Sequence, residues 1–214
     1  MSGFFATFFI VMIFIIGYAL QRNNATRKYE KNSHDFWEKE SLANSTRKKS
    51  LDGLTLITIP LEELPFSDSQ DDTLKECEDI IRILASKDII NLTGISNTDL
   101  KLTYGAPNFP YLSSCDQNFT DLVRTLNQWA KRLLELNQTE AAQKVLEFAI
   151  ECKSDVSTTY QMLSSIYAQQ HESEKIQSLM ETAETLNTLL KNKILKDLEE
   201  TYLNSGSGFE DLFT

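Results

Sequence analysis

The chain has 214 residues, of which 41% are hydrophobic, and this is enough for one packed domain with appendages. Residues 1–50 carry eight Lys and Arg residues against four acidic ones, a net charge of +4, whereas residues 51–214 carry a net charge of −14. A body of that sign excludes nucleic acid as the expected partner, because phosphate binding needs clustered Lys and Arg. The basic N-terminal part is suited to lie near anionic lipid.

The N-terminal stretch Gly3–Leu20 contains no charged residue. A helix of this length spans about 27 Å, close to the hydrocarbon thickness of a bilayer. No basic residue precedes the stretch and Tyr18–Gln21 is a poor cleavage site, so we expect an uncleaved transmembrane anchor over residues 1–21 rather than a signal peptide. The nearest basic residues all follow it: Arg22, Arg27, Lys28 and Lys31. The positive-inside rule then predicts a single-pass protein of the cell membrane, with its N-terminus outside and its C-terminal body in the cytoplasm.

The segment between the anchor and the body is polar. Residues 22–50 have Phe36-Trp37 as their only large apolar pair. We expect a basic juxtamembrane helix or spacer, with a helix lying along the lipid headgroups as the alternative.

Residues 51–118 combine an extended strip with helices. Leu51–Phe66 is rich in β-branched residues and holds two prolines, which favours an extended strip packed along the helical body; an edge open to a partner peptide is the alternative. Helical spacing begins at Asp71, where Thr73–Glu76 has a capping-box pattern, and a brief helix capped by Asn97 follows. Gly105–Pro107 predicts a break, followed by a loop through Pro110. These helices are expected to cap the body.

From Phe119 the sequence repeats itself at an interval of 34 residues. Small residues alternate with large ones, as helix–turn–helix hairpins require where two helices approach closely. The matching pairs are Leu126 and Tyr160, Ala130 and Ser164, Leu133 and Tyr167, and Ala149 and Ala183. The pattern resembles the tetratricopeptide repeat family over about residues 119–188. It departs from the family at Ser154 and Thr188, where a turn proline is usual, and at Ile176, which replaces a small residue.

The resemblance implies stacked helical hairpins over residues 119–203, ending in a C-terminal capping helix. Glu174–Leu203 has neither Gly nor Pro, so one long helix is an alternative to the turn that the repeat predicts near Thr188. Residues 204–214 are expected to form a flexible tail that ends in an acidic and hydrophobic peptide.

A second resemblance covers the whole chain. Asn91–Gly94, Ser96–Leu102, Tyr104–Asn108 and Asp116–Phe119 are similar to a pattern in uncharacterised single-pass membrane proteins of Gram-positive bacteria, which implies an anchor and a helical-repeat body. The expected fold class is therefore all-α, with an N-terminal single transmembrane helix followed by a small tetratricopeptide-like helical-hairpin body with atypical capping helices.

The sequence contains no catalytic constellation. Its only histidines, His34 and His171, have no partner nearby in sequence, and its three cysteines form no metal-binding or redox pattern. We expect no enzyme activity, cofactor, metal ion or small-molecule substrate.

The repeat phase predicts a partner-binding surface instead. It assigns six residues to the inner side of the array: Arg124, Asn127, Lys131, Leu134, Gln161 and Ser165. This polar face holds two cations in an acidic body, and we expect it to receive an extended or helical peptide that bears a carboxylate.

The predicted function is that of a membrane-anchored protein–protein interaction scaffold with a cytoplasmic helical-repeat docking surface. Its expected partners are the lipid bilayer, through residues 3–20, and a protein or peptide on the repeat surface. The alternative is an extracytoplasmic, N-anchored accessory protein of the cell envelope.

Overall fold

The structure is a computed structural model that describes residues 18, 21–22, 32–67 and 69–205. Throughout these residues the chain is helical or irregular, and none of them lies in a β-strand. The described chain is therefore all-α, as the hydrophobic periodicity predicts.

The predicted transmembrane helix requires a correction. Among the residues that the structure describes, none of the helices combines the length and the apolar character needed to span a bilayer. The longest, α4 (Phe109–Glu135, 27 residues), carries Asp121 and Arg124 near its middle, where charges make insertion costly. Residues 3–20 lie outside the described residues apart from Tyr18. We therefore withdraw the membrane span from the fold class, together with the predicted single-pass cell-membrane localisation and orientation.

The described residues divide into two compact units. The first contains the residues up to Ser50 together with Ser96–Phe109, and the second contains Leu51–Ile95 and the residues from Pro110 onward. The predicted boundaries instead placed Ser96–Phe109 with the strip of residues 51–66 and the helix that begins near Asp71.

The first unit pairs a helix at residues 32–45 with α3 (Asn97–Tyr104), which is followed by the short 3₁₀ helix η1 (Ala106–Asn108). Lys39 Nζ lies 2.7 Å from Asp99 Oδ1, and Lys101 Nζ lies 2.6 Å from Glu40 Oε1. The helix at residues 32–45 is thus paired with α3, which differs from the separate spacer expected for residues 22–50.

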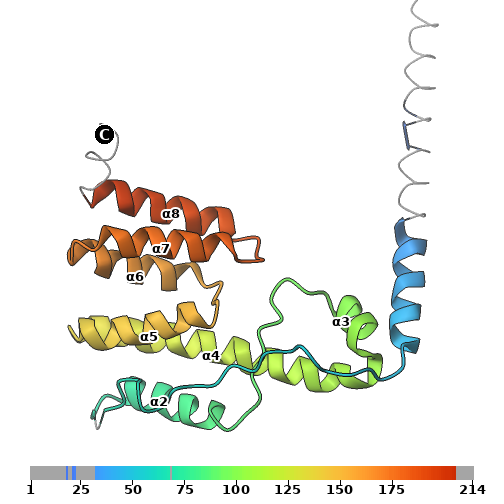
Figure 1. The fold of residues 1–214 in the computed structure, drawn as a ribbon, viewed down its shortest axis with the longest axis horizontal. Helices are drawn as coiled ribbons and strands as arrows, with labels where there is room; N and C mark the ends of the chain where they lie inside the picture. The colour runs from blue at the N-terminus through green and yellow to red at the C-terminus, as the bar shows by residue number, and fades with distance from the viewer. Residues whose placement is uncertain (1–17, 19–20, 23–31, 68, 206–214) are drawn as a thin grey trace, which may run out of the picture. The chain divides into compact units, whose positions relative to one another are not determined.

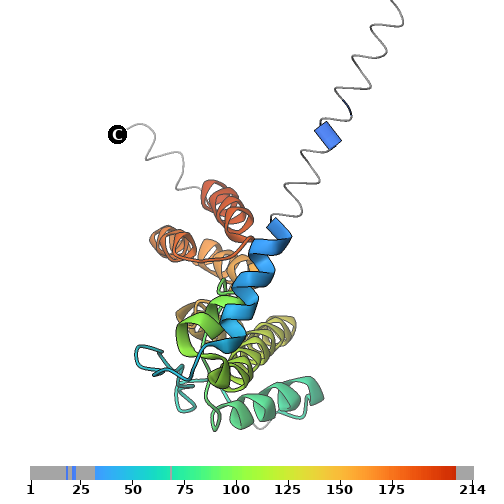
Figure 2. The ribbon, with the colours of Figure 1, turned by 90° about the vertical axis from the view of Figure 1, so that its right-hand side faces the viewer.

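The second unit is a stack of helices. Its members are α2 (Asp72–Leu84), α4, α5 (Thr139–Glu151), α6 (Ser157–Gln169), α7 (Ser173–Glu184) and α8 (Lys191–Asn204). In Figure 1, α4, α6 and α8 run in one direction, and α5 and α7 run in the opposite direction. Figure 2, turned by 90°, shows the same helices with α2 at one end of the stack and α8 at the other.

The backbone repeats at the interval that the sequence predicts. Asn137, between α4 and α5, has a φ of 59°, and His171, 34 residues later between α6 and α7, has a φ of 60°. The N–H of Gln138 donates to the carbonyl oxygen of Leu133 at 2.9 Å, and the equivalent bond from Glu172 to Tyr167 is also 2.9 Å. These bonds close the C-terminal ends of α4 and α6 in the same way. Residues 109–184 are therefore two successive helical hairpins.

The small residues of the repeat lie inside the stack, as predicted. Ala130, Ala142, Ala149 and Ala183 are all fully buried within one continuous hydrophobic core. Because an alanine offers only a methyl group, the backbones of neighbouring helices can approach closely at these positions. The large residues beside them, among them Trp129, fill the remaining space.

The turn near Thr188 is also confirmed, because α7 ends at Glu184 and α8 begins at Lys191. The predicted loop through Pro110 is wrong, because α4 already begins at Phe109. Proline is tolerated in the first turn of a helix, where its missing N–H would have no intrahelical partner.

The ends of the other helices differ in detail from the predicted caps. Helix α2 is capped by Asp71, whose carboxylate accepts from the N–H of Leu74 at 3.0 Å, and α3 is capped by Ser96. The strip of residues 51–66 has neither helix nor strand, turns at residues 52–53 and 61–64, and buries Ile59 and Leu64 in the core. Its N–H at Ile57 donates to the carbonyl oxygen of Ile89 at 2.9 Å.

The end of α5 offers a test of this local geometry. Lys153 has a φ of 55°, a left-handed conformation that costs a residue with a side chain roughly 1 kcal/mol. We expect Lys153→Gly to raise the free energy of unfolding by about 1 kcal/mol in urea denaturation followed by circular dichroism. The control is Thr185→Gly at the end of α7, where φ is −78° and the same change should destabilise. Destabilisation by both changes would contradict the prediction.

Candidate partner-binding site

The six predicted site residues lie on two neighbouring helices, four on α4 and two on α6. Arg124, Lys131, Gln161 and Ser165 are exposed, whereas Asn127 and Leu134 are partly buried. We call the surface formed by these six residues the α4/α6 face.

Asn127 fixes the register between the two helices. Its Nδ2 donates to Thr158 Oγ1 at 2.9 Å and to Thr159 Oγ1 at 3.0 Å. Since α4 and α6 run in the same direction, the residues seven positions further along each helix are also neighbours. These residues are Leu134 on α4 and Ser165 on α6.

Leu134 and Ser165 lie on the wall of a hollow of about 230 Å³ that is mainly apolar. We call it the α4/α6 hollow, and its lining residues are Leu134, Gln161, Met162, Ser165, Ile166 and Gln169. The structure thus brings together three of the six predicted residues. Met162, Ile166 and Gln169 were missed by the sequence argument, although Met162 and Ile166 stand at an i, i+4 spacing that could have placed them on one side of α6.

A third helix extends the α4/α6 face. Gln161 Nε2 donates to Asp197 Oδ2 on α8 at 2.8 Å, and the Ser165 hydroxyl donates to the carbonyl oxygen of Gln161 at 2.8 Å. The predicted surface did not include Asp197, because α8 was assigned only a capping role. The amide and hydroxyl groups here are therefore held in place by the protein itself.

The two predicted cations do not line this hollow. Arg124 lines a separate hollow of about 330 Å³, as do Asp116 and Asp155. Burial raises the pKa of Asp116, against the opposing effect of a hydrogen bond from the backbone of Leu92. Lys131 is exposed one helical turn before Leu134. Of the two cations, only Lys131 is therefore placed to act on a partner bound in the α4/α6 hollow.

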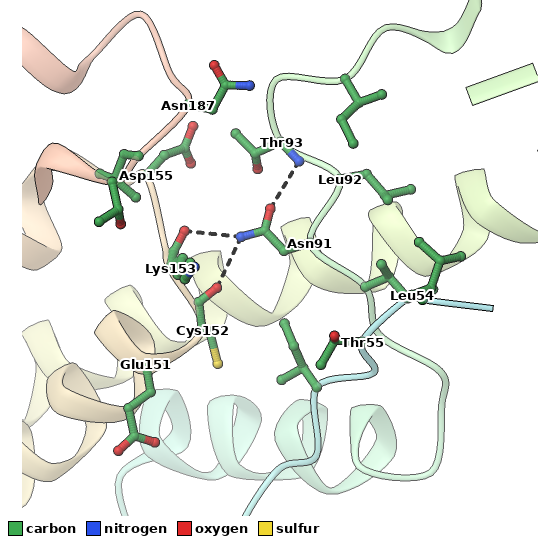
Figure 3. A pocket seen from close by; sticks show the side chains of 16 residues that line it. Leu54, Thr55, Asn91, Leu92, Thr93, Glu151, Cys152, Lys153, Asp155 and Asn187 are labelled. Atoms are coloured by element: carbon green, nitrogen blue, oxygen red, sulfur yellow. Dashed lines mark hydrogen bonds between the residues drawn. The ribbon is translucent and has the colours of Figure 1, made fainter. Parts of the chain in front are cut away.

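A further pocket has a volume of about 460 Å³ and lies where four segments of the second unit meet. These segments are residues 53–57, 90–95, 151–155 and 185–187. Figure 3 shows Asn91 with its amide directed toward the end of α5. Its Nδ2 donates to the carbonyl oxygens of Cys152 at 3.1 Å and Lys153 at 3.2 Å, and its Oδ1 accepts from the N–H of Thr93 at 3.0 Å.

The polar groups of Asn91 are thus already engaged in holding the segments together. The Cys152 thiol also lines the pocket, and burial, assisted by the charge of Glu151, raises its pKa to about 12. The thiol therefore stays protonated at neutral pH, and only the thiolate is a nucleophile. We interpret this pocket as a structural junction.

One group of potential metal ligands lies in the first unit. The ligand atoms of His34, Asp35 and Glu38 all fall within 4.8 Å of one another, and all three residues are exposed. They follow one another on a single helical segment, where such proximity is common without a metal ion, and we assign them no role.

Comparison of the chain with protein-family models, with curated proteins and with solved structures finds no match.

Proposed function

We propose that α4–α8 form a docking module for a protein partner, a non-catalytic function that uses the α4/α6 face in the manner of a tetratricopeptide array. The observation that carries the proposal is the convergence of Leu134, Gln161 and Ser165 on an apolar hollow between two parallel helices. The agreement of backbone angles and hydrogen bonds at a 34-residue interval supports the family resemblance.

The size of the hollow favours a side chain over a small molecule. Pockets that bind small ligands are usually about 300–1,000 Å³, and this one is about 230 Å³. A peptide that places one apolar side chain in it would bury the exposed parts of Leu134 and Met162. The side-chain amides of Gln161 and Gln169 stand at the rim as hydrogen-bonding groups for the peptide backbone.

The negative charge of the protein around the hollow limits how acidic a partner can be. Residues 51–214 carry a net charge of −14, which repels acidic partners over a range of about 8–10 Å at physiological salt. Lys131 offers a local exception beside the hollow. The partner that fits both conditions is a peptide with an apolar anchor, little net negative charge and one carboxylate placed beside Lys131.

The test uses a display library of random-sequence peptides selected on the full chain. We expect the selected peptides to bind the unmodified protein about tenfold more tightly than the Ser165→Trp variant, whose indole would fill the hollow. Lys131→Glu should weaken acidic peptides selectively. The matched control is Ser178→Trp, at an exposed serine of α7.

Circular dichroism first establishes that the variants keep the helical content of the unmodified protein. Selected peptides that bind the Ser165→Trp and Ser178→Trp variants equally well would exclude the α4/α6 face as the docking surface, and so would a selection that enriches no peptide.

A further inference from the structure

The hollow that Arg124 lines collects charged groups of both signs. Asp116 and Asp155 line the same hollow, whose volume is about 330 Å³, and we call it the Arg124 hollow. Among the residues that the structure describes, none forms an ion pair with any of these three side chains. The hollow therefore presents one positive and two negative groups that do not neutralise one another.

The spacing of residues along α4 separates two of these charges. Asp116, Thr120 and Arg124 stand at positions i, i+4 and i+8, so they lie on one face of the helix. Eight residues correspond to about 12 Å along the helix axis. The carboxylate of Asp116 and the guanidinium of Arg124 therefore belong to one wall of the hollow but are attached two turns apart.

Asp155 lies about level with Arg124. Asn127 on α4 donates to Thr158 on α6 at 2.9 Å, and the two helices run in the same direction. Three residues earlier in each segment are Arg124 and Asp155, the latter just before α6 begins at Ser157. Since both side chains line one hollow, a ligand lying there can contact a cation and a carboxylate at the same level.

The carboxylate of Asp116 has no cation to offset its burial. Burial raises the pKa of Asp116, and the hydrogen bond from the backbone of Leu92 opposes this rise. A positively charged ligand group beside Asp116 would compensate for the lost hydration. Between the charges, the hollow is lined by apolar side chains, among them Leu92, Phe119, Val123 and Val156.

We propose that the Arg124 hollow binds a free basic α-amino acid, with lysine as the best match. Lysine carries one negative and two positive groups, the complement of the charges in the hollow. Its carboxylate pairs with Arg124, its α-ammonium with Asp155 and its side-chain ammonium with Asp116. The apolar stem of lysine, which extends about 6 Å from the α-carbon, passes along the apolar lining toward Asp116.

The size of the hollow suits a ligand of this class. Its volume of about 330 Å³ falls at the lower end of the usual range for small-molecule pockets, about 300–1,000 Å³. This proposal goes beyond the docking function, because the Arg124 hollow is separate from the α4/α6 hollow. It also departs from the expectation of no small-molecule partner. That expectation came from the lack of a catalytic constellation, which a binding site does not need.

The test measures the binding of L-lysine to the full chain by isothermal titration calorimetry, beside three analogues that each lack one charged group. 6-Aminohexanoate lacks the α-ammonium, norleucine lacks the side-chain ammonium, and 1,5-diaminopentane lacks the carboxylate. We expect saturable binding of lysine, and binding of each analogue that is about tenfold weaker, because each loses one charge-assisted hydrogen bond.

Three variants assign the charges to residues. In Asp116→Asn, lysine and norleucine should bind equally, because the group that recognises the side-chain ammonium has lost its charge. Asparagine can still accept the backbone hydrogen bond of Leu92. By the same reasoning, Asp155→Asn should equalise lysine and 6-aminohexanoate, and Arg124→Gln should equalise lysine and 1,5-diaminopentane. The matched control is Lys131→Gln, at an exposed cation of the same helix outside the hollow, which should leave lysine binding unchanged.

Circular dichroism first establishes that the variants keep the helical content of the unmodified protein. Lack of saturable lysine binding at millimolar concentrations would overturn the proposal, and so would an analogue that binds the unmodified protein as tightly as lysine. Equal losses for Arg124→Gln and Lys131→Gln would show a response to net charge alone and would also overturn it. None of these results bears on the docking function, which the peptide library tests at the α4/α6 hollow.

Discussion

Trp129→Ala is expected to lower the free energy of unfolding by about 3–5 kcal/mol. The indole is fully buried on α4, and its ring centroid lies 5.2 Å from that of Phe66. The side chain therefore joins the strip of residues 51–66 to the first hairpin, and its removal leaves a cavity at that junction. Urea denaturation followed by circular dichroism measures the loss.

Trp129→Phe is the matched control. The Nε1 of Trp129 is buried and finds no hydrogen-bond acceptor among the described residues. Phenylalanine keeps an aromatic ring and removes this unsatisfied donor, so the loss should be no more than about 1.5 kcal/mol. If alanine were tolerated as well as phenylalanine, Trp129 could not be the packing centre of this junction.

Asn91→Asp is expected to lower the free energy of unfolding by about 2–3 kcal/mol at neutral pH. The substitution keeps the shape of the side chain but removes the two N–H donors to Cys152 and Lys153. It also places a negative charge against two carbonyl oxygens. The hydrogen bond from the N–H of Thr93 is retained. The decrease in the free energy of unfolding therefore measures what the contact between Asn91 and the end of α5 contributes.

The pH dependence of this variant has a definite sign. The facing carbonyl oxygens disfavour the charged form of the new carboxyl group, so its pKa in the folded state is raised. The protonated group can donate again, and part of the lost stability should return as the pH falls below that raised value. Asn187→Asp, in the same pocket but exposed, should change stability by no more than about 0.5 kcal/mol. A loss for Asn91→Asp that is independent of pH would contradict this account.

The sequence predicted the hairpins because their geometry depends on a local pattern. Small residues must recur where helices approach each other closely. The 34-residue interval between Ala149 and Ala183 is therefore visible in the sequence. The same interval placed the turn near Thr188. It could not predict the start of α4, because Gly105–Pro107 and Pro110 together indicate a break in the helix. The structure shows that Pro110 lies in the first turn of α4, where proline is tolerated.

Contacts between distant parts of the chain produce no comparable pattern in the sequence. The pairing of the helix at residues 32–45 with α3 depends on ion pairs such as that of Lys39 with Asp99, and the spacing of charges does not reveal their partners. For the candidate site, the repeat phase identified Leu134, Gln161 and Ser165. It also included Arg124, which the structure places beside a different hollow. The membrane prediction rested on the length and composition of residues 3–20 and on the basic residues that follow them.

The packing of α8 has a consequence for how the array opens. Within the second unit, α8 packs on α6 and α7, and those helices contact their own neighbours in turn. Stability in such a stack is approximately a sum over adjacent interfaces, so a terminal element can detach while the interior remains folded. Undocking α8 would break the bond between Gln161 and Asp197 and free one flank of the face on which Gln161 lies. Local unfolding of α8 would therefore increase the access of a partner to the α4/α6 face.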